Sequence, residues 1–246
     1  MDRLIYVAMT GAKQLMQAQS LVANNLANVG TIGFRADLAR FSAQPVAGPG
    51  YASRVNTVAS GLGFDSSQGT MQETGNTLDV AIEGAGYIAV QAADGSEAYT
   101  RGGTLNVNAL GLLETQRGEI VLGDNGPLAV PPYSEITVAH DGTIAIVPQG
   151  QGAETMAQVG RIKLVNPDPA MLEKRTDGLI RMAEGAAADA DASVRLASGF
   201  IESSNVNVAS ALVDMIEYAR QFEIAVRMMR VADDNEARAA QIARLG

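Results

Sequence analysis

MDRLIYVAMTGAKQLMQAQSLVANNLANVG, residues 1–30, repeats apolar residues at the seven-residue spacing of a coiled-coil helix. Eight of the nine seam positions in this stretch are apolar, and the exception is Gln19. The pattern stops at Gly30 and Gly33, where we expect the helix to end. The seam positions are Met1, Ile5, Ala8, Ala12, Leu15, Gln19, Val22, Leu26 and Val29.

The other end of the chain carries the same heptad pattern. Ser203-Ser204-Asn205 precede it and are good N-cap residues. We therefore expect long helices within residues 1–35 and 199–246 that pair as a coiled coil. The C-terminal seam positions are Val208, Leu212, Met215, Ala219, Phe222, Val226 and Met229.

Between these ends, short runs of alternating apolar residues are separated by Asx-Gly dipeptides. Asx-Gly supplies the positive φ that tight hairpins need, so the pattern predicts an antiparallel all-β domain over residues 71–198. Residues 36–70 are rich in Gly, Pro, Ser and Ala without a clear period, which predicts an extended connector. The expected fold class is thus α+β. The runs are LDVAI (78–82), YIAVQA (87–92), TLNVN (104–108), EIVL (119–122), EITVA (135–139), TIAIV (143–147), RIKLV (161–165) and LIRMA (179–183), and the dipeptides are Asp94-Gly95, Asn125-Gly126, Asp141-Gly142 and Asp177-Gly178.

Composition excludes several classes of function. The chain of 246 residues has no Cys and one His, which excludes thiol catalysis, disulfides and a Cys/His zinc site. A net charge of −9, all of it within residues 36–198, argues against nucleic-acid binding. The longest uncharged run, Gln14–Phe34, holds too many amides for a membrane span. The apolar run that follows Met1-Asp2-Arg3, Leu4–Met9, is too short for a secretory signal.

Two features of the β region imitate catalytic or cofactor sites. Gly84-Ala85-Gly86 begins a G-x-G-x-x-A match to a dinucleotide-binding loop, but the residues that follow alternate like a strand, where that loop needs a helix. His140 precedes a hairpin turn without a nucleophile elbow, so we expect an exposed turn-flanking histidine. We expect no enzyme, no cofactor and no metal.

Motifs in three regions of the chain, the N-terminal stripe, the β region and the C-terminal stripe, resemble the bacterial flagellar rod and hook family. They occur in the family's order and cover nearly the whole chain. The opening MDRLIYVAMTGAKQ (1–14), ARQFE (219–223) and ADDN (232–235) are further similar to the proximal rod branch, with the distal rod branch as the alternative. The family motifs are NNLANVGTIGFRAD (24–37), TGNTLDVAIEGAGYIAV (74–90), AYTRGGTLNVNALGLLET (98–115), VLGDNGPLAVP (121–131) and ESSNVNVASALVDMIEYARQFE (202–223).

The resemblance implies a structural subunit of the flagellar basal-body rod in the periplasm, exported by the flagellar type III apparatus without a cleaved signal peptide. Both terminal helices would form an inner coiled-coil tube, with the β domain outside, and the polymer would transmit torque. Implied partners are neighbouring proximal and distal rod subunits, copies of the chain itself and the export apparatus. No nucleic acid, small-molecule substrate or direct membrane span is implied.

The resemblance also implies roles for individual residues. The apolar heptad residues would fill the seam, and three asparagines near residue 25 would hydrogen-bond neighbouring chains. Thr31, Gly33 and Phe34 would turn the chain out of the tube and anchor it. Arg220 and Glu223 would pair across subunits or form a solvated pair on one helix face. The expected assembly residues are Leu15, Val22, Asn24, Asn25, Leu26, Asn28, Thr31, Gly33, Phe34, Asn205, Val206, Met215, Ile216, Arg220, Phe222, Glu223 and Val226.

Two other classes of function stay open at this point. A periplasmic or surface binding module would need an exposed apolar patch within residues 70–198. A β-rich hydrolase would need a cleft with a perturbed carboxylate. Neither alternative accounts for the paired terminal stripes.

Overall fold

A computed structural model describes residues 4–45, 55–152, 155–183 and 185–245. Met1, the first heptad position, lies outside these residues. The chain divides into two compact units. The helical unit comprises Met1–Ala27, Asp37–Gly63 and Val206–Gly246, and the β unit comprises Asn28–Ala36 and Phe64–Asn205. The fold is therefore mixed α+β, with a β-rich region between two terminal helices, as expected from the sequence.

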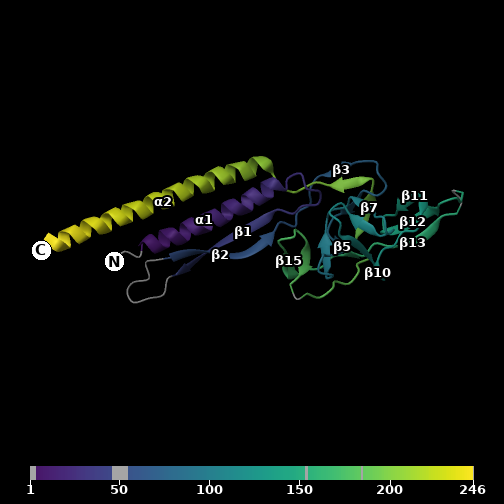
Figure 1. The fold of residues 1–246 in the computed structure, drawn as a ribbon, viewed down its shortest axis with the longest axis horizontal. Coiled ribbons are helices and arrows are strands. Elements are labelled where there is room, and N and C mark those ends of the chain that lie inside the picture. Colours follow the sequence, from purple (N-terminus) through teal and green to yellow (C-terminus); the bar gives the residue numbers. More distant parts are fainter. Residues whose placement is uncertain (1–3, 46–54, 153–154, 184, 246) are drawn as a thin grey trace. The chain divides into compact units, whose positions relative to one another are not determined.

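The helical unit contains helices α1 (Leu4–Ala27) and α2 (Val208–Leu245) and strands β1 (Asp37–Pro45) and β2 (Val55–Phe64), the last residue of which belongs to the β unit. The two helices pack side by side and run in opposite directions (Figure 1). Asn207 caps α2, because its Oδ1 accepts the Ser210 N–H at 3.1 Å. The capping residue therefore lies two positions beyond the Ser203-Ser204-Asn205 stretch expected to start this helix.

The described parts of the expected connector, residues 36–45 and 55–70, contain two strands, and its residues 46–54 lie outside the described residues. Strands β1 and β2 pair as a two-stranded sheet, and β1 also packs against α1. The sequence did not reveal these strands because Gly, Ala and Ser give no alternation, whereas backbone pairing needs none. Helix α1 also ends at Ala27, before the glycines expected to stop it, and residues 28–36 belong to the β unit.

The β unit is built from antiparallel pairs. One nine-stranded sheet has the order β15-β16-β6-β5-β9-β8-β7, with β10 beside β9 and β14 beside β5. A three-stranded sheet, β11-β12-β13, and the pairs β17-β4 and β18-β3 complete it. The strands are β3 (Met71–Glu73), β4 (Val80–Glu83), β5 (Tyr87–Gln91), β6 (Glu97–Thr100), β7 (Leu105–Val107), β8 (Leu113–Thr115), β9 (Ile120–Gly123), β10 (Gly126–Pro127), β11 (Tyr133–Val138), β12 (Thr143–Pro148), β13 (Ala157–Arg161), β14 (Leu164–Val165), β15 (Leu172–Lys174), β16 (Ile180–Met182), β17 (Arg195–Ser198) and β18 (Phe200–Glu202), with a 3-10 helix over Pro169–Met171.

The sequence missed several short strands and found the turns. Strands β6, β8 and β17 have three or four residues, too few to show a period. Each of the four Asx-Gly dipeptides has its glycine at a φ between 81° and 115°, which confirms the predicted turn chemistry. Gly84-Ala85-Gly86 leads directly into strand β5, so the helix that a dinucleotide-binding loop requires does not follow.

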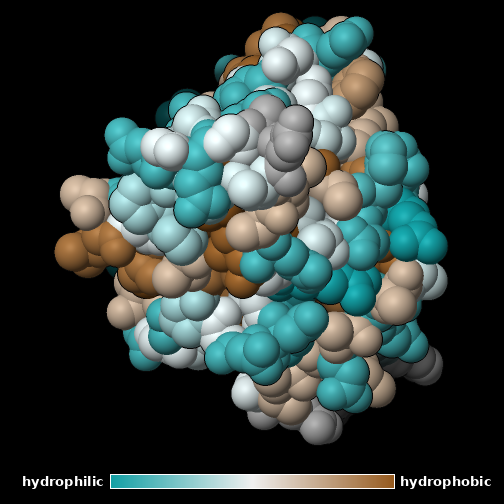
Figure 2. All heavy atoms as spheres, turned by 90° about the vertical axis from the view of Figure 1, so that its right-hand side faces the viewer, coloured by the Kyte–Doolittle hydropathy of each residue, from teal (hydrophilic) through white to brown (hydrophobic). Residues whose placement is uncertain are grey.

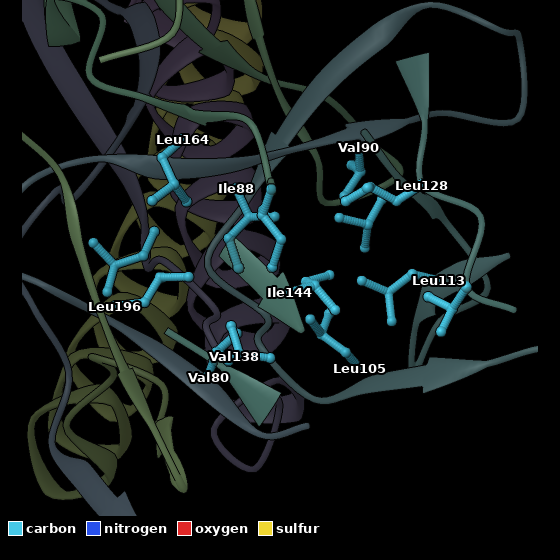
Figure 3. Packing of buried hydrophobic residues seen from close by; sticks show 14 of the residues in the cluster. Val80, Ile88, Val90, Leu105, Leu113, Leu128, Val138, Ile144, Leu164 and Leu196 are labelled. Atoms are coloured by element: carbon cyan, nitrogen blue, oxygen red, sulfur yellow. The ribbon is translucent and has the colours of Figure 1, made fainter. Parts of the chain in front are cut away.

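The core of the β unit is apolar and closely packed. Side chains from β4, β5, β7, β8, β11, β12, β14 and β17 point toward one another in Figure 3. A second buried cluster forms around Tyr87 and Tyr99. Burying such residues contributes about 1.5–3 kcal/mol for each large side chain. The β unit therefore has its own core to support the segments described below. Ile88, Leu105, Leu113, Ile144 and Leu196 are fully buried.

Candidate assembly interface

Several predicted seam residues are half-buried in the helical unit, whereas Val208 and Leu212 of the α2 seam are 42% and 45% exposed. Ala12 and Ala18 on α1 and Ala211 and Ala232 on α2 are buried. Small alanine side chains allow close approach of helix backbones. Part of the apolar surface of the two helices is therefore already buried within this one chain. The half-buried seam residues are Leu15, Val22, Leu26, Met215, Phe222 and Val226.

Helix α2 exposes a second apolar face, which we call the outer stripe. Its members recur at spacings of 3, 8, 7 and 11 residues, which return to one side of an α-helix. Each is more than half exposed, although large apolar residues gain free energy from burial. The heptad positions include none of them, and only Ile216 is among the assembly residues that the family resemblance implied. The outer stripe comprises Val213 at 62%, Ile216 at 68%, Ile224 at 51%, Val231 at 52% and Ile242 at 73% exposure.

Two charged residues of α2 were predicted to take part in assembly. Arg220 and Glu223 are both exposed. Arg220 lies four residues after Ile216 and four before Ile224, so it falls within the outer stripe. Its long aliphatic stem can cover apolar surface while the guanidinium stays in water. Helix α1 likewise exposes the large apolar residues Tyr6 and Met16, at 66% and 58%.

The asparagines near the end of α1 bond within the chain. Asn25 Oδ1 accepts the Asp37 N–H at 2.8 Å, and Asn25 Nδ2 donates to the Asp37 carbonyl at 2.9 Å. Asn24 Nδ2 donates to the Asp37 carboxylate at 3.3 Å. In the β unit, Thr31 Oγ1 donates to Asn28 Oδ1 at 3.2 Å. The amides expected to reach neighbouring chains thus also hold the first residue of β1 and the turn after α1.

Residues 28–36, which we call the strap, pack against the β unit. The Gly33 N–H donates to the Glu202 carbonyl at 2.7 Å. Gly33 has φ +68°, and a Cβ there would lie 2.2 Å from the Arg101 carbonyl carbon, so no other residue fits without displacing backbone. Phe34 is buried, with Lys174 Nζ 3.7 Å from its ring centroid. These residues turn and anchor the chain, and the surface they anchor to is the β unit.

A buried ionic cluster lies beneath the strap. Glu202 is fully buried, and its Oε1 and Oε2 lie 2.6 Å from Arg35 Nη1 and 2.8 Å from Arg101 Nη1. The Gly69 N–H donates to the same carboxylate at 2.7 Å. Burial lowers the pKa of Arg101, and the Glu202 charge opposes that shift. The cluster therefore contains two guanidinium groups, of Arg35 and Arg101, and one carboxylate.

The sequence did not point to Glu202 or Arg101 as special. Each is a single charged residue in a short segment, and the partners are 101 positions apart. The only local signal is a charge beside apolar residues in Phe200–Glu202, a strand with no solvent face for that side chain. Burial raises the pKa of Tyr87, whose ring centroid lies 5.4 Å from the Arg101 guanidinium.

The amide of Asn205 links three segments of the β unit. Its Oδ1 accepts the Ala36 N–H at 2.7 Å. Its Nδ2 donates to the carbonyls of Asp65 at 3.0 Å and Ser67 at 3.1 Å. Asn205 had been expected at the assembly interface, and here its polar atoms are engaged inside the chain. Val206, expected beside it, is half-buried at the start of the C-terminal part of the helical unit.

Three carboxylates of the β unit are held in the charged form by hydrogen bonds within turns. The pKa values of Asp94, Asp141 and Asp191 are lowered, and in each the leading cause is a hydrogen bond from the residue two positions on. That is the chemistry of Asx turns, whereas a general acid needs a raised pKa. His140 is exposed, and its Nδ1 lies 2.8 Å from the Leu196 carbonyl oxygen, consistent with the turn-flanking role expected.

One groove of the β unit is apolar. It has a volume of about 610 Å³ and is lined in part by Leu110, Pro132 and Tyr133. Leu110 is 84% exposed. On the face drawn in Figure 2, however, hydrophobic residues form small groups between hydrophilic ones. Broad apolar exposure is instead found along α2. Among the described residues, no helix has the length and apolar character required to cross a membrane.

Comparison with known proteins assigns the family. Residues 5–35 match the model of the flagella basal body rod protein, residues 81–146 the flagellar hook protein FlgE/F/G D1 domain, and residues 197–242 the flagellar basal body rod FlgEFG protein C-terminal region. The chain is 43% identical over 248 residues to the flagellar basal-body rod protein FlgF of Escherichia coli K12, covering 98% of both chains.

More distant relatives match over similar lengths. The FlgF protein of Caulobacter vibrioides is 34% identical over 255 residues, covering 100% of this chain and 99% of the relative. The FlgG protein of Bacillus subtilis is 31% identical over 257 residues, covering 95% and 96%. The chain therefore belongs to the flagellar basal-body rod family, as a FlgF-like structural protein and not an enzyme.

Proposed function

We propose that this rod subunit polymerises through its terminal helices, which form a coiled-coil inner tube with subunits of the proximal and distal rod and with copies of itself. The observation that carries the proposal is the outer stripe of α2. Its five large apolar residues are more than half exposed in the single chain. Burying each of them against a neighbouring subunit would contribute about 1.5–3 kcal/mol.

The apolar residues of the helices take two roles in this proposal. The half-buried seam residues hold α1 to α2, and the outer stripe, which includes the expected residue Ile216, contacts neighbours together with Arg220. An aspartate in the outer stripe would place a charge in a packed interface, where desolvation is costly. The same change is exposed in the free chain, so it should leave the monomer folded.

The test uses Ile216→Asp, with Ile216→Leu as the matched control. We expect Ile216→Asp to abolish motility and the recovery of the chain in purified hook–basal bodies, while circular dichroism of the purified monomer is unchanged. Ile216→Leu keeps an apolar side chain and should assemble normally. Normal assembly of Ile216→Asp would overturn the proposal.

We further propose export of the chain by the flagellar type III apparatus, without a cleaved signal peptide, and transmission of torque by the assembled tube. Membership of the rod family supports both. In cells with a working apparatus, the secreted chain should have the mass of the unprocessed polypeptide, and it should stay inside cells that lack the apparatus. A secreted chain of lower mass would contradict export without cleavage.

The proximal and distal branches of the rod family differ in how many subunits a rod needs. Quantitative mass spectrometry of hook–basal bodies can count copies of this chain. A handful per particle supports the proximal rod, and several helical turns' worth supports the distal rod. Absence from the particle would favour a binding module that uses the groove at Leu110.

A further inference from the structure

Three segments of the β unit adjoin the helical unit in the sequence: the strap, residues 64–69 and residues 202–205. Within the β unit they bond directly to one another. The Asp65 N–H donates to the Ala36 carbonyl at 2.8 Å, and the Asn205 N–H donates to the Phe34 carbonyl at 3.3 Å. The backbone and side-chain contacts of Asn205 with the strap join residues 171 and 169 positions apart.

Glu202 and Asn205, both within residues 202–205, each bind the strap and residues 64–69. Asn205 holds Ala36 of the strap and the carbonyls of Asp65 and Ser67. Glu202 holds Arg35 of the strap and the Gly69 N–H. Neither the strap nor residues 64–69 contain a regular helix, so these hydrogen bonds replace those that secondary structure would supply.

We propose that Glu202 and Asn205 form a clamp that docks the strap and residues 64–69 on the β unit before assembly. The pre-ordered part of the free subunit then extends to residue 28 at one end and residue 205 at the other. Because the clamp residues lie near the C-terminus, the strap docks only after nearly the whole chain is available. The inference concerns the free chain and does not depend on polymerisation of the helices.

Asn205 suits this role because its amide combines one acceptor and one donor group on a short side chain. Its Oδ1 accepts an N–H of the strap, and its Nδ2 donates to two carbonyls of residues 64–69. Aspartate has the same shape but no N–H. In Asn205→Asp, a carboxylate oxygen would face the Asp65 carbonyl, which lies 3.0 Å from Nδ2 in the wild-type chain, and would repel it.

The experiment is hydrogen–deuterium exchange of the full-length monomer, comparing wild type, Asn205→Asp and Asn207→Asp. The control carries the same chemical change two residues away, where aspartate can still accept the Ser210 N–H. We expect amide exchange in residues 28–36 and 64–69 to accelerate at least about tenfold in Asn205→Asp, since two or three hydrogen bonds are lost. Asn207→Asp should match wild type there.

Exchange in strands β5 and β9 reports the stability of the β core and should be unchanged in both variants. Exchange of the strap within twofold of wild type in Asn205→Asp would overturn the clamp. Equal acceleration of the strap and the core would also overturn it, because Asn205 would then support the whole unit and not the docking of these segments. Either result leaves the proposed polymerisation untouched, since its test is assembly of Ile216 variants.

Discussion

Glu202 and Arg101 form a fully buried ion pair, with Oε2 and Nη1 2.8 Å apart and side chains 0% and 3% exposed. Arg35 shares the same carboxylate. Arg101 Nη2 also donates to the Gly84 carbonyl at 2.6 Å, whereas Nε of Arg101 and both Nε and Nη2 of Arg35 have no hydrogen-bond partner among the described residues. Both oxygens of the Glu202 carboxylate thus have partners, whereas two nitrogens of the Arg35 guanidinium group have none among the described residues.

This asymmetry predicts different costs for removing the two charges. Glu202→Gln leaves two buried guanidinium groups without a counter-charge and should lower the free energy of unfolding by about 3–5 kcal/mol. Arg35→Met removes the surplus cation and should change it by less than about 1 kcal/mol. Chemical denaturation followed by circular dichroism measures both. Glu173→Gln, at an exposed position, is the control and should change little. Equal losses in Glu202→Gln and Arg35→Met would contradict the prediction.

Gly33 and Gly30 offer a matched pair of substitutions. Gly33→Ala forces an L-residue into φ +68° and places its Cβ 2.2 Å from backbone, so we expect a loss of at least about 2 kcal/mol or undocking of the strap. A Cβ at Gly30 would meet no atom within 4 Å, so Gly30→Ala should be nearly neutral. Thermal unfolding and exchange of the strap amides distinguish them. Similar behaviour of the two variants would contradict the geometry at Gly33.

Tyr99 predicts a loss of stability at alkaline pH. Burial raises the pKa of Tyr99 from 10.0 to about 12, although the Ala188 N–H donates to its hydroxyl oxygen. The unfolded chain therefore loses this proton first. The stabilisation is complete below pH 10, declines as pH rises from 10 to 12, and amounts to about 1–2 kcal/mol. Denaturant midpoints at pH 9 and 11 measure it. In Tyr99→Phe the midpoint should fall less over this range, and an equal fall in both proteins would rule out Tyr99 as the cause.

The helix seam predicts a selective loss of assembly. Leu26→Asp or Phe222→Asp places a charge at a half-buried seam position of the helical unit. We expect a soluble chain with an intact β core and no rod assembly, measured by motility and by exchange of the β-strand amides. Normal motility with both substitutions present would contradict this role of the seam.

Local sequence patterns determined the two helices, the β-rich region between them and the glycines of the Asx-Gly turns. These features repeat over a few residues, so spacing alone reveals them. The terminal motifs also led to the rod family. The pattern did not reveal β1 and β2, whose Gly, Ala and Ser residues pair through backbone atoms and carry no alternation.

The tertiary structure alone decided which atoms meet across the chain. Asn25 binds Asp37, and Asn205 binds residues of the strap and of 64–69, although the sequence suggested partners in other subunits. Arg35 and Glu202 come together from opposite ends of the chain. A charged residue carries no local sign of a partner so far away, because pairing depends on how the strands enclose it. Periodicity predicted a seam on α2, and only the packed structure showed that the outer stripe remains exposed.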